Sequence, residues 1–449
     1  EFLRQHVDEE EIRAGGLKIY TTIDFSKQAA ALSAVRGNIL TLRAQLASKS
    51  PFPPQETEKL KEGLNGVLLS VEPRTGEILA LVGGYGADES GRRSRVYQMR
   101  RQPGSSIKGF LYATALDRGL LKEDSEVNDE PVNIGGYRPQ NWYGGFKGKM
   151  TLRHAIAQSV NTVAVLTLKD LGIGTFRDRI ADALDVSSFE IADRMPGNLS
   201  LALGSGELSP EEMSRLYAPL LNGGRRVHTR LIRRIEDAKG RTVFMDEFVP
   251  DRSRLISRAS CSSILRLMGS VIESEGTAEW IGKYRQTHAG LNFPAAAKTG
   301  TVETESSVSR KFRGMQGVHD AWFVGLVPGE ATIVWVGQDE GAPFPGSGAG
   351  SAGGIWLSYV QAIRYSIHGD FPREDDPESE PDIAPISDDN PDEKKPSDKE
   401  EERPLPDENG PAQSPEGKEL RVRPDGQIEK PAETKPGDTI RVPDEKASG

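Results

Sequence analysis

One stretch of the sequence, RQPGSSIKGFLYATALDRG at residues 101–119, constrains the fold more than any other. After a turn at Pro103, apolar residues follow so closely that the predicted helix has almost no polar face before Gly119 ends it. A helix of this kind is buried on nearly every side. Ser105 and Lys108 stand three residues apart at its start, so they share one face. Because the first-turn N–H groups give that end positive character, a hydroxyl, an amine and an anion site are adjacent.

Ser105 and Lys108 also permit an ordinary interpretation, in which the serine caps the helix and the lysine is a surface charge. A lone Ser-x-x-Lys match is weak evidence against it. Lys108 is, however, the only long charged side chain between Arg101 and Asp117. A charged amine in such an apolar segment is costly unless it is neutral or partnered. The pattern therefore favours a chemical role for Lys108.

The charge of the chain is concentrated at its end. The 449 residues suffice for two ordinary domains or one large one, and their formal net charge is −10. Residues 371–449 alone contain 24 acidic and 12 basic side chains, so the remainder is nearly neutral. An arginine cluster at positions 92–101 is typical of a solvated loop, and we predict no nucleic-acid partner.

Other features of the sequence exclude whole classes of site. Cys261 is the only cysteine, so no intrachain disulfide and no Cys-x-x-Cys metal or redox site is possible. No His-Glu-x-x-His motif occurs, and we predict neither a metal nor another cofactor. No run of ~18 apolar residues is present to form a transmembrane helix. The first residues show neither an initiator methionine nor a signal-peptide pattern, so we expect the C-terminal portion of a longer protein whose membrane anchor lies outside this chain.

The order of the secondary-structure signals predicts an α+β fold, with strands first, helices in the middle, and strands with a helix last. We expect a mainly antiparallel sheet flanked by helices, with an all-helical subdomain. A lead-in at 1–65 precedes one domain at 66–370. The predicted elements are a strand at GLKIYTTID, a helix at 25–46, a hairpin turning at Pro73–Gly76, helices within 105–220 that begin at Thr151 and Ser209 and end at Gly172 and Gly223, a hairpin turning at Pro328–Gly329, and a helix at 355–367.

Residues 371–449 have a different composition from the rest. They include 14 prolines among many Asp, Glu and Lys residues. Such a composition cannot bury enough apolar surface to fold, and we predict that this acidic tail is disordered.

Two further short motifs occur once each. SVN at 159–161 lies in the helical region, and KTG at 298–300, followed by Thr301, ends a predicted strand. A specified tripeptide arises by chance in roughly one chain of this length in twenty, and a single Ser-x-Asn is more typical of a helix cap than of a site. Their order and placement after the Ser-x-x-Lys turn change this interpretation. Together the three motifs are the signature of penicillin-recognising serine enzymes.

The resemblance extends to longer segments. GLKIYTTID, EPRTGEILALVGG, RQPGSSIK, the Pro139-Gln140-Asn141 loop, LALGSGELSPEEMSRLYAPLLNGG and DAWFVG resemble the transpeptidase module of the class A, or bifunctional, penicillin-binding proteins. The resemblance covers roughly residues 15–365.

Three positions depart from the family pattern. Gly109 stands where proline usually follows the lysine, Arg93-Ser94 stands where Phe-Asn is common, and the connection at 302–320 is longer than usual. We expect these departures to affect the rim of the site and not its chemistry.

The resemblance implies a role for each motif residue. The catalytic residues would be Ser105 as the acylated nucleophile, Lys108 as its general base and Ser159 as the proton relay to the leaving amine. The substrate-binding residues would be Asn161, which holds the peptide amide, and Lys298, Thr299 and Thr301, which bind the terminal carboxylate, with Gly300 allowing close backbone approach. The backbone N–H groups of Ser105 and Thr301 would form the oxyanion hole.

The implied activity is that of a D,D-transpeptidase. Such an enzyme cross-links peptidoglycan stem peptides through a serine acyl-enzyme formed from a D-Ala-D-Ala donor, and β-lactams inhibit it covalently. Its partners would be the donor and amine-acceptor stem peptides, with other cell-wall synthesis proteins as candidates for the tail. Its location would be the extracytoplasmic face of the bacterial cytoplasmic membrane.

Two alternatives keep the same acylation site: a D,D-carboxypeptidase or β-lactamase that hydrolyses the acyl-enzyme, and a non-catalytic β-lactam sensor or scaffold. The glutamate segment of a class A β-lactamase is missing, since Glu190 is the only glutamate from Thr162 to Leu203 and is predicted to be an ordinary helix edge. The six histidines offer no Ser-His-Asp arrangement, and the His319-Asp320 pair, which opens a strand, is predicted to be structural.

Overall fold

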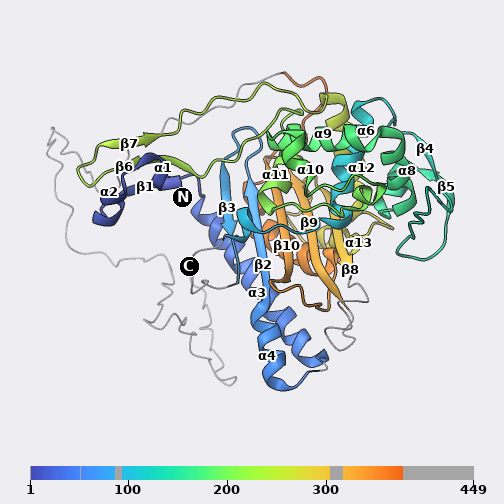
Figure 1. The fold of residues 1–449 in the computed structure, drawn as a ribbon, viewed down its shortest axis with the longest axis horizontal. Helices are drawn as coiled ribbons and strands as arrows, with labels where there is room; N and C mark the ends of the chain where they lie inside the picture. Colours follow the sequence, from blue (N-terminus) through green and yellow to red (C-terminus); the bar gives the residue numbers. More distant parts are fainter. Residues whose placement is uncertain (1, 51, 86–93, 304–316, 378–449) are drawn as a thin grey trace, which may run out of the picture. The chain divides into compact units, whose positions relative to one another are not determined.

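The computed structural model describes residues 2–50, 52–85, 94–303 and 317–377. Its architecture is α+β, as predicted, with helices packed on a central antiparallel sheet (Figure 1). The strands are β1 (Lys18–Thr21), β2 (Leu64–Val71), β3 (Ile78–Val82), β4 (Glu126–Asp129), β5 (Gly148–Thr151), β6 (Ile232–Glu236), β7 (Thr242–Met245), β8 (Ala296–Glu303), β9 (Val318–Val327) and β10 (Glu330–Gln338).

The helices come in groups between runs of strands along the chain. The α-helices are α1 (Phe2–His6), α2 (Glu9–Ala14), α3 (Phe25–Lys49), α4 (Pro54–Gly63), α5 (Arg95–Gln98), α6 (Lys108–Asp117), α7 (Leu152–Ala157), α8 (Asn161–Leu171), α9 (Ile173–Leu184), α10 (Ser188–Ala192), α11 (Pro210–Leu221), α12 (Arg258–Gly269), α13 (Glu279–Thr287) and α15 (Gly353–Ala362). Short 3₁₀ turns are η1 (Gly104–Ile107), η2 (Leu199–Leu203), η3 (Ser270–Ile272) and η5 (Arg364–Ser366), and η4 (Gly348–Ala352) is a π-helical turn.

The main sheet has five strands in the order β3-β2-β10-β9-β8, and every neighbouring pair is antiparallel. Both predicted hairpins are confirmed, because β2 pairs with β3 and β9 pairs with β10. In the first turn the Glu72 carboxylate accepts hydrogen bonds from the Thr75 amide and hydroxyl, each 2.6 Å long. β8, which carries the KTG motif, forms one edge of the sheet.

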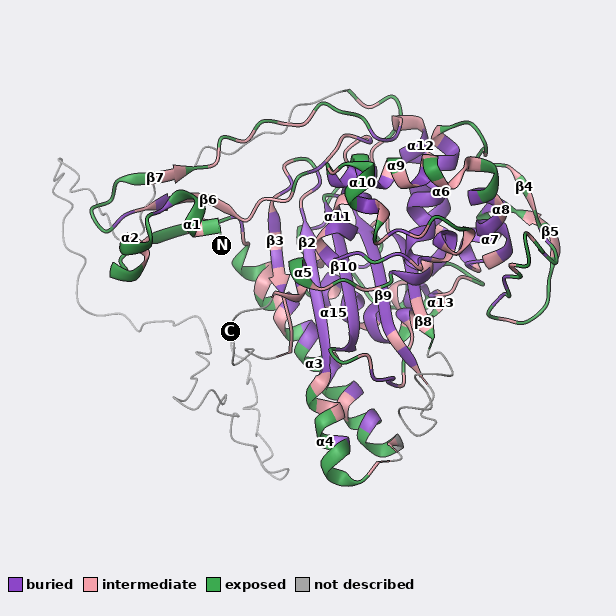
Figure 2. Ribbon diagram, viewed as in Figure 1, coloured by how far each residue is buried: buried purple, intermediate pink, exposed green. Residues whose placement is uncertain are grey.

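Helices cover both faces of this sheet, so β2 and β10 are buried along their whole length (Figure 2). α3 and α15 pack together on one face, and α11 and α12 lie on the other. α3 falls within the predicted lead-in at 1–65, yet its Val35 and Ile39 are fully buried in the same core as the sheet. The helix therefore contributes to the fold that carries the motifs.

The helical part surrounds α6. This helix contacts α8, α9 and α12, which explains why its sequence is apolar on almost every side. Thr151 caps α7, Gly172 ends α8, and Ser209 begins α11 in a capping box with Glu212, as predicted for the two clearest helical segments. Between α7 and α8 the chain turns at Ser159, whose φ is 53°.

Several short elements were not anticipated. The predicted GLKIYTTID strand is β1, but it pairs with β6 in a separate three-stranded sheet of order β1-β6-β7, and β4 pairs with β5 in a third sheet. Strands of four or five residues that are only partly buried carry little alternation of apolar and polar residues, so sequence gives them a weak signal. The last α-helix, predicted at 355–367, spans Gly353–Ala362 and is followed by the 3₁₀ turn η5.

The predicted disordered tail lies outside the described residues from position 378 onward. Its first residues, 371–377, lie against α12, where the Ser262 hydroxyl donates to the Pro372 carbonyl at 3.0 Å.

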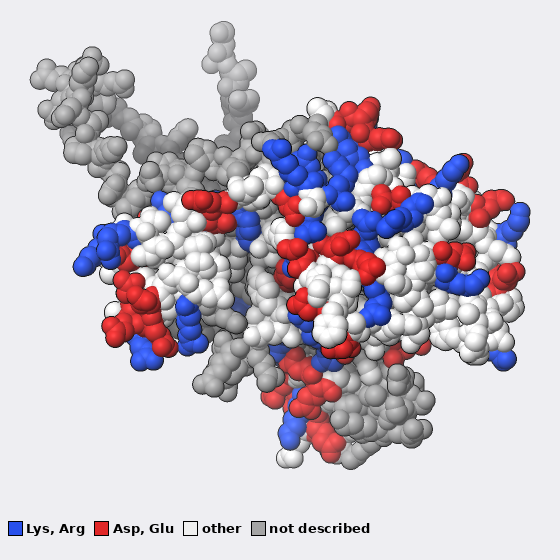
Figure 3. All heavy atoms as spheres, turned by 45° about the horizontal axis from the view of Figure 1, so that its top comes forward, with Lys and Arg blue, Asp and Glu red and all other residues white. Residues whose placement is uncertain are grey.

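The described arginines of the cluster form ion pairs, which the predicted solvated loop did not include. Arg92 and Arg93 lie outside the described residues, while the other three form ion pairs, Arg95 with Asp339 at 2.5 Å, Arg100 with Glu212 at 3.3 Å and Arg101 with Asp320 at 3.9 Å. On the face drawn in Figure 3, acidic and basic side chains are interspersed. Among the described residues, no helix combines the length and apolar character that a membrane crossing requires.

Candidate active site

Ser105 lies in the 3₁₀ turn η1, which leads directly into α6. Gly104 before it has a φ of 54°, a left-handed conformation that suits glycine, and an added Cβ there would lie 3.0 Å from the Thr301 carbonyl oxygen. The neighbouring Ser106 is buried, and its hydroxyl donates to the Pro103 carbonyl at 2.6 Å. Ser105 is partly exposed, and its hydroxyl has no hydrogen-bond partner among the described residues. The turn thus leaves one of two adjacent serines free.

Lys108, the first residue of α6, is fully buried, and its Nζ donates three hydrogen bonds. The acceptors are the Asn161 Oδ1 at 2.6 Å, the Ser159 carbonyl at 2.7 Å and the Ser159 hydroxyl at 3.3 Å. Burial, aided by the nearby Lys298 charge, holds the pKa of Lys108 well below its usual value. The sequence placed this amine within reach of the Ser105 hydroxyl, but its hydrogen bonds in the structure go to the SVN motif.

Ser159 stands at the junction of α7 and α8. Its left-handed φ of 53° is uncommon for a residue other than glycine, and such conformations gather at functional sites. Its Oγ accepts a hydrogen bond from Lys298 Nζ at 2.9 Å in addition to the one from Lys108. One hydroxyl therefore joins lysines from two distant motifs.

Lys298 on β8 is also fully buried, and its Nζ donates to the Thr299 carbonyl at 3.0 Å. Burial lowers the pKa of Lys298 to about 7. Within the described part of the chain, no carboxylate pairs with Lys298 or with Lys108. A neutral amine is therefore accessible at Lys298 near neutral pH.

Asn161 is held by a loop that the family resemblance had marked without giving it a role. The buried Asn141 accepts a hydrogen bond from the Asn161 N–H at 2.9 Å and donates one to Asp129 at 2.7 Å. The Asn161 side chain donates in turn to the Gln140 carbonyl at 2.6 Å. This loop fixes the amide whose oxygen accepts from Lys108.

The rest of the KTGT segment passes close to the Ser105 turn. A Cβ added at Gly300 would lie 2.3 Å from the Pro103 carbonyl oxygen, so only glycine permits this approach. The Thr301 hydroxyl accepts a hydrogen bond from the Gly348 N–H at 3.0 Å, which ties the end of the motif to η4.

Thr277 is a residue of this site that sequence reasoning missed. Its hydroxyl lies 3.0 Å from that of Thr299, and its N–H donates to the Ala157 carbonyl at 3.0 Å. Thr277 thus connects the KTG strand with the end of α7. No motif marks it, because it lies in an irregular loop whose position follows only from the fold.

The structure brings all three motifs together, from η1 and α6, from the α7–α8 junction and from β8. The predicted site residues that meet here are Ser105, Lys108, Ser159, Asn161, Lys298, Thr299, Gly300 and Thr301. The His319-Asp320 pair lies at the start of β9, where the Asp320 carboxylate accepts from Trp335 Nε1 at 2.9 Å, as expected for a structural pair. Among the described residues, no cluster of three or more His, Cys, Asp or Glu side chains is placed to hold a metal ion.

A free serine one turn before a buried lysine, with a second lysine on the edge strand of an antiparallel sheet, defines the class of penicillin-recognising serine proteins. Residues 66–352 match the penicillin binding protein transpeptidase domain, and the chain belongs to this family.

Curated relatives agree with the predicted resemblance to the class A proteins. Penicillin-binding protein 1A of Neisseria gonorrhoeae is 31% identical over 318 residues, which cover 68% of this chain and 36% of that protein. Penicillin-binding protein 1A of Aquifex aeolicus is 30% identical over 319 residues, 70% of this chain and 39% of that protein. The chain thus spans little more than a third of the length of these relatives.

Solved structures share the fold. Penicillin-binding protein 1A from Haemophilus influenzae superposes with a TM-score of 0.63 at 21% identity and covers 86% of this chain and 72% of that one. The PonA1 protein from Mycobacterium tuberculosis in complex with penicillin V gives a TM-score of 0.63 at 23% identity, over 83% of this chain and 92% of that one.

Proposed function

We propose that this chain is a D,D-transpeptidase, which forms a serine acyl-enzyme from a donor stem peptide ending in D-Ala-D-Ala and passes the acyl group to an amine. One observation carries the proposal. The Ser159 hydroxyl is bonded to two fully buried lysines, Lys108 at 3.3 Å and Lys298 at 2.9 Å, next to the turn that holds the free Ser105. Acyl transfer needs a nucleophilic hydroxyl, a base, a proton relay and an anion receptor, and these four side chains match those needs.

Lys108 is the proposed general base. Because burial lowers its pKa, a neutral amine is available to take the Ser105 proton while Oγ attacks the scissile carbonyl carbon. The hydrogen bonds from Lys108 to Ser159 and Asn161 hold Nζ in place in the free protein. The contact with Ser105 would form when substrate brings the two groups together, as catalytic hydrogen bonds commonly tighten in the complex.

Ser159 is the proposed proton relay. After the tetrahedral intermediate forms, the Ser159 hydroxyl gives its proton to the leaving D-alanine nitrogen and recovers one from Lys108, which had taken it from Ser105. The carbon–nitrogen bond breaks, and the acyl group remains on Ser105 Oγ. The hydrogen bond from Lys298 keeps the Ser159 oxygen in position for both transfers.

Lys298 is the proposed receptor for the terminal carboxylate, together with the hydroxyls of Thr299 and Thr301. A bound carboxylate favours the ammonium form, so it would raise the pKa of Lys298 from about 7 and keep the amine charged in the complex. The N–H groups of Ser105 and Thr301 are proposed to stabilise the oxyanion.

The position of β8 supports a peptide as substrate. β8 has a neighbouring strand only on its β9 side among the described residues, and an extended peptide can bind such an edge through backbone hydrogen bonds. Because Gly300 lies against the Ser105 turn, a peptide along β8 would bring its scissile bond to Ser105, with Asn161 holding the peptide amide.

We extend the proposal to the biological setting. Peptidoglycan stem peptides would be donor and acceptor, the extracytoplasmic face of the membrane would be the place of action, and the tail would contact other cell-wall synthesis proteins. The domain at 66–370 would carry the activity behind the lead-in at 1–65. Similarity to a PonA1 protein solved with penicillin V supports β-lactams as covalent probes of Ser105.

Incubation with a penicillin tests the proposal directly. We expect a single penicilloyl adduct on Ser105, because the lactam carbonyl mimics the scissile amide. Intact-mass measurement and peptide mapping should find no adduct on Ser105→Ala. Ser106→Ala is the matched control, since the neighbouring hydroxyl is buried and bonded to the Pro103 carbonyl, and it should still be acylated. An adduct on Ser105→Ala would refute the assignment of the nucleophile.

A further inference from the structure

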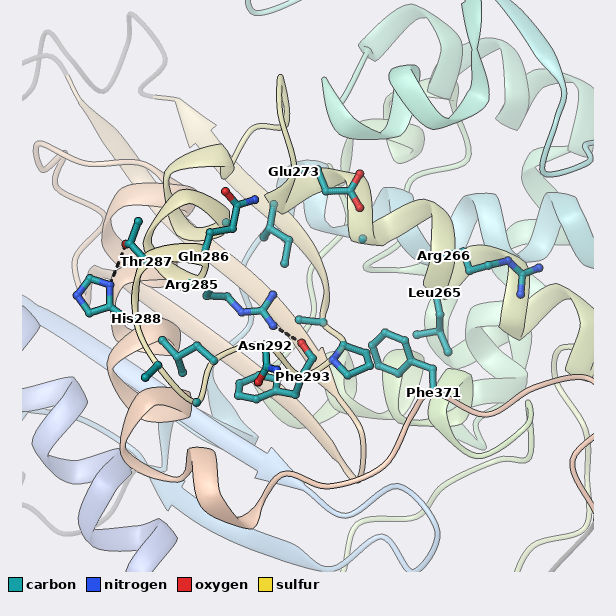
Figure 4. Close-up of a pocket in the computed structure, with 18 of the residues that line it drawn as sticks. Leu265, Arg266, Glu273, Arg285, Gln286, Thr287, His288, Asn292, Phe293 and Phe371 are labelled. Carbon is teal, nitrogen blue, oxygen red and sulfur yellow. Dashed lines mark hydrogen bonds between the residues drawn. The ribbon is translucent and has the colours of Figure 1, made fainter.

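A cleft lies apart from the motif residues, between α12, α13 and the segment that leads into β8 (Figure 4). Its volume is about 840 Å³, enough for a small organic ligand. Arg266 on α12, Arg285 on α13, Phe293 before β8 and Phe371 all contribute to its walls. None of the eight predicted site residues lines it.

Three arginines line this cleft, and two of them have carboxylate partners there. Arg153 pairs with Glu273, and Arg266 pairs with Glu123 at 2.6 Å. Arg285 has no carboxylate partner among the described residues. The charged side chains of the cleft therefore leave one positive charge without a counterion, at Arg285.

The Arg285 guanidinium uses few of its hydrogen-bond donors. Nη2 donates to the Phe293 carbonyl, as the dashed line in Figure 4 marks, and the guanidinium carbon lies 4.9 Å from the centroid of the Phe293 ring. Nε is buried without a partner. Burial lowers the pKa of Arg285 to about 10, the effect expected for a cation that has lost water without gaining an anion. The group stays charged at neutral pH, and no described residue provides it with an anionic partner.

The rim around Arg285 offers polar and apolar contacts. Gln286 and Asn292 are exposed, and their side-chain amides have no hydrogen-bond partner among the described residues. The partly exposed rings of Phe293 and Phe371 also line the cleft, and Asn292 lies beside Phe293 next to the Arg285 guanidinium (Figure 4). A fitting ligand would combine an anionic group, amide groups and an apolar side chain.

We propose that this cleft is a binding site for the free carboxylate of a short peptide or an N-acylated amino acid. The carboxylate would lie against the Nη edge of Arg285, because the planar guanidinium suits carboxylates in a two-point hydrogen-bonded pair. Gln286 and Asn292 would bind the adjoining amide, and an apolar side chain would pack on Phe293 and Phe371. The proposal does not depend on the chemistry at Ser105.

The test uses the full chain labelled with ¹⁵N-arginine, and N-acetyl-L-phenylalanine as the probe. We expect saturable movement of the Arg285 side-chain Nε–H signal, which is identified by its loss in Arg285→Lys. The C-terminal amide of the same compound, and Arg285→Gln with the acid, should each show binding weaker by about tenfold or more, as expected for loss of a charged hydrogen bond. Arg266→Gln is the matched control, because that guanidinium is already paired with Glu123, and it should bind within about twofold of the unmodified chain.

Equal responses to the acid and the amide would overturn the proposal, and so would unaltered binding of the acid to Arg285→Gln. Arg285 also ties α13 to the Phe293 carbonyl, so Arg285→Gln can lower stability, and its melting temperature is measured beside Arg266→Gln. If Arg285→Gln does not fold, the comparison of acid with amide on the unmodified chain decides the matter alone. A purely structural arginine would not distinguish those two compounds.

Discussion

Lys108 and Lys298 share one hydroxyl in a site where the described residues supply no carboxylate. Burial lowers the pKa of both amines, and the charge of Lys298 lowers that of Lys108 further. The lowered pKa of Lys108 favours a neutral amine that can act as a base, and the pKa of Lys298 lies at about 7. In the proposed mechanism Lys108 acts as the neutral base, and a bound carboxylate would restore the charge of Lys298.

Replacing Lys108 with arginine separates charge from basicity. The arginine guanidinium stays protonated over the whole pH range in which proteins are folded. Lys108→Arg therefore keeps the positive charge but cannot accept the Ser105 proton. We expect the second-order rate of acylation by penicillin to fall by roughly 10²–10⁴-fold, the usual contribution of general base catalysis. The rate is measured by timed intact-mass spectrometry, with circular dichroism to check folding. Near-normal acylation in this variant would remove Lys108 from the base role.

The pH dependence of acylation should have two limbs. The second-order rate constant should rise as Lys108 loses its proton, and it should fall as the free protein passes the lowered pKa of Lys298, about 7, because a neutral amine no longer attracts the penicillin carboxylate. In Lys298→Arg the charge persists, so the falling limb should move to much higher pH. A falling limb that is unchanged in Lys298→Arg would assign it to another group.

The contact between α6 and α11 explains one departure from the family pattern. Gly109, where the family usually has proline, lies under Tyr217 of α11, and an added Cβ would lie 2.5 Å from the tyrosine oxygen and 3.1 Å from Met268 Sδ. Tyr217 is fully buried and donates a hydrogen bond to the Ser106 carbonyl. Glycine and tyrosine are therefore complementary here, and the tyrosine holds the turn that contains Ser105.

Gly109→Ala tests this packing. We expect it to lower the free energy of unfolding by about 1–3 kcal/mol, because the methyl group overpacks the contact with Tyr217. The loss should be smaller when Tyr217→Phe is present, since that change removes the closest atom. Denaturant unfolding of the two single variants and the double variant measures their coupling energy. Additive losses would show that Tyr217 does not constrain position 109.

The gathering of the three motifs was predictable because each carries its residues within a few positions. The Ser-x-x-Lys turn, the SVN junction and the KTG strand each combine a local signal with a recognisable type of element. The two hairpins were likewise predictable, since a turn sequence lies between two apolar runs at Pro73–Gly76 and at Pro328–Gly329.

What the sequence did not reveal depends on contacts between distant segments. Thr277 has no local pattern, and it reaches Thr299 only because the loop after η3 packs beside β8. Sequence reasoning missed the hydrogen-bond partners of Lys108 for the same reason: spacing on a helix pointed to Ser105, and the fold also brings Ser159 and Asn161 to its amine. Helical spacing gives proximity along one element, and burial in a tertiary core decides which acceptor is used.

Hydrolysis of the acyl-enzyme would need a carboxylate near Ser105 that can activate a water molecule. Glu190 is exposed and forms the capping box of α10 with Ser187. This position agrees with its prediction as an ordinary helix edge. The carboxylate that the Asn161 loop does reach, Asp129, accepts hydrogen bonds from the side chains of Asn141, Tyr143 and Thr162. Neither carboxylate is free to direct water at an ester on Ser105.

Because neither Glu190 nor Asp129 can activate water, the acyl group should wait for an amine that binding can orient. We predict that the penicilloyl adduct persists for many minutes or longer, as followed by intact-mass spectrometry after removal of free penicillin. A thioester or depsipeptide donor should be consumed faster when a D-amino acid or a stem-peptide amine is added, and the mass of the new amide should appear in the product. Ser105→Ala with the same donor and amine is the control for uncatalysed aminolysis.

Loss of the adduct within seconds, with donor consumption that no amine accelerates, would make the protein a hydrolase. An adduct that persists while no donor is consumed would instead favour a sensor, because acylation would then occur without transfer.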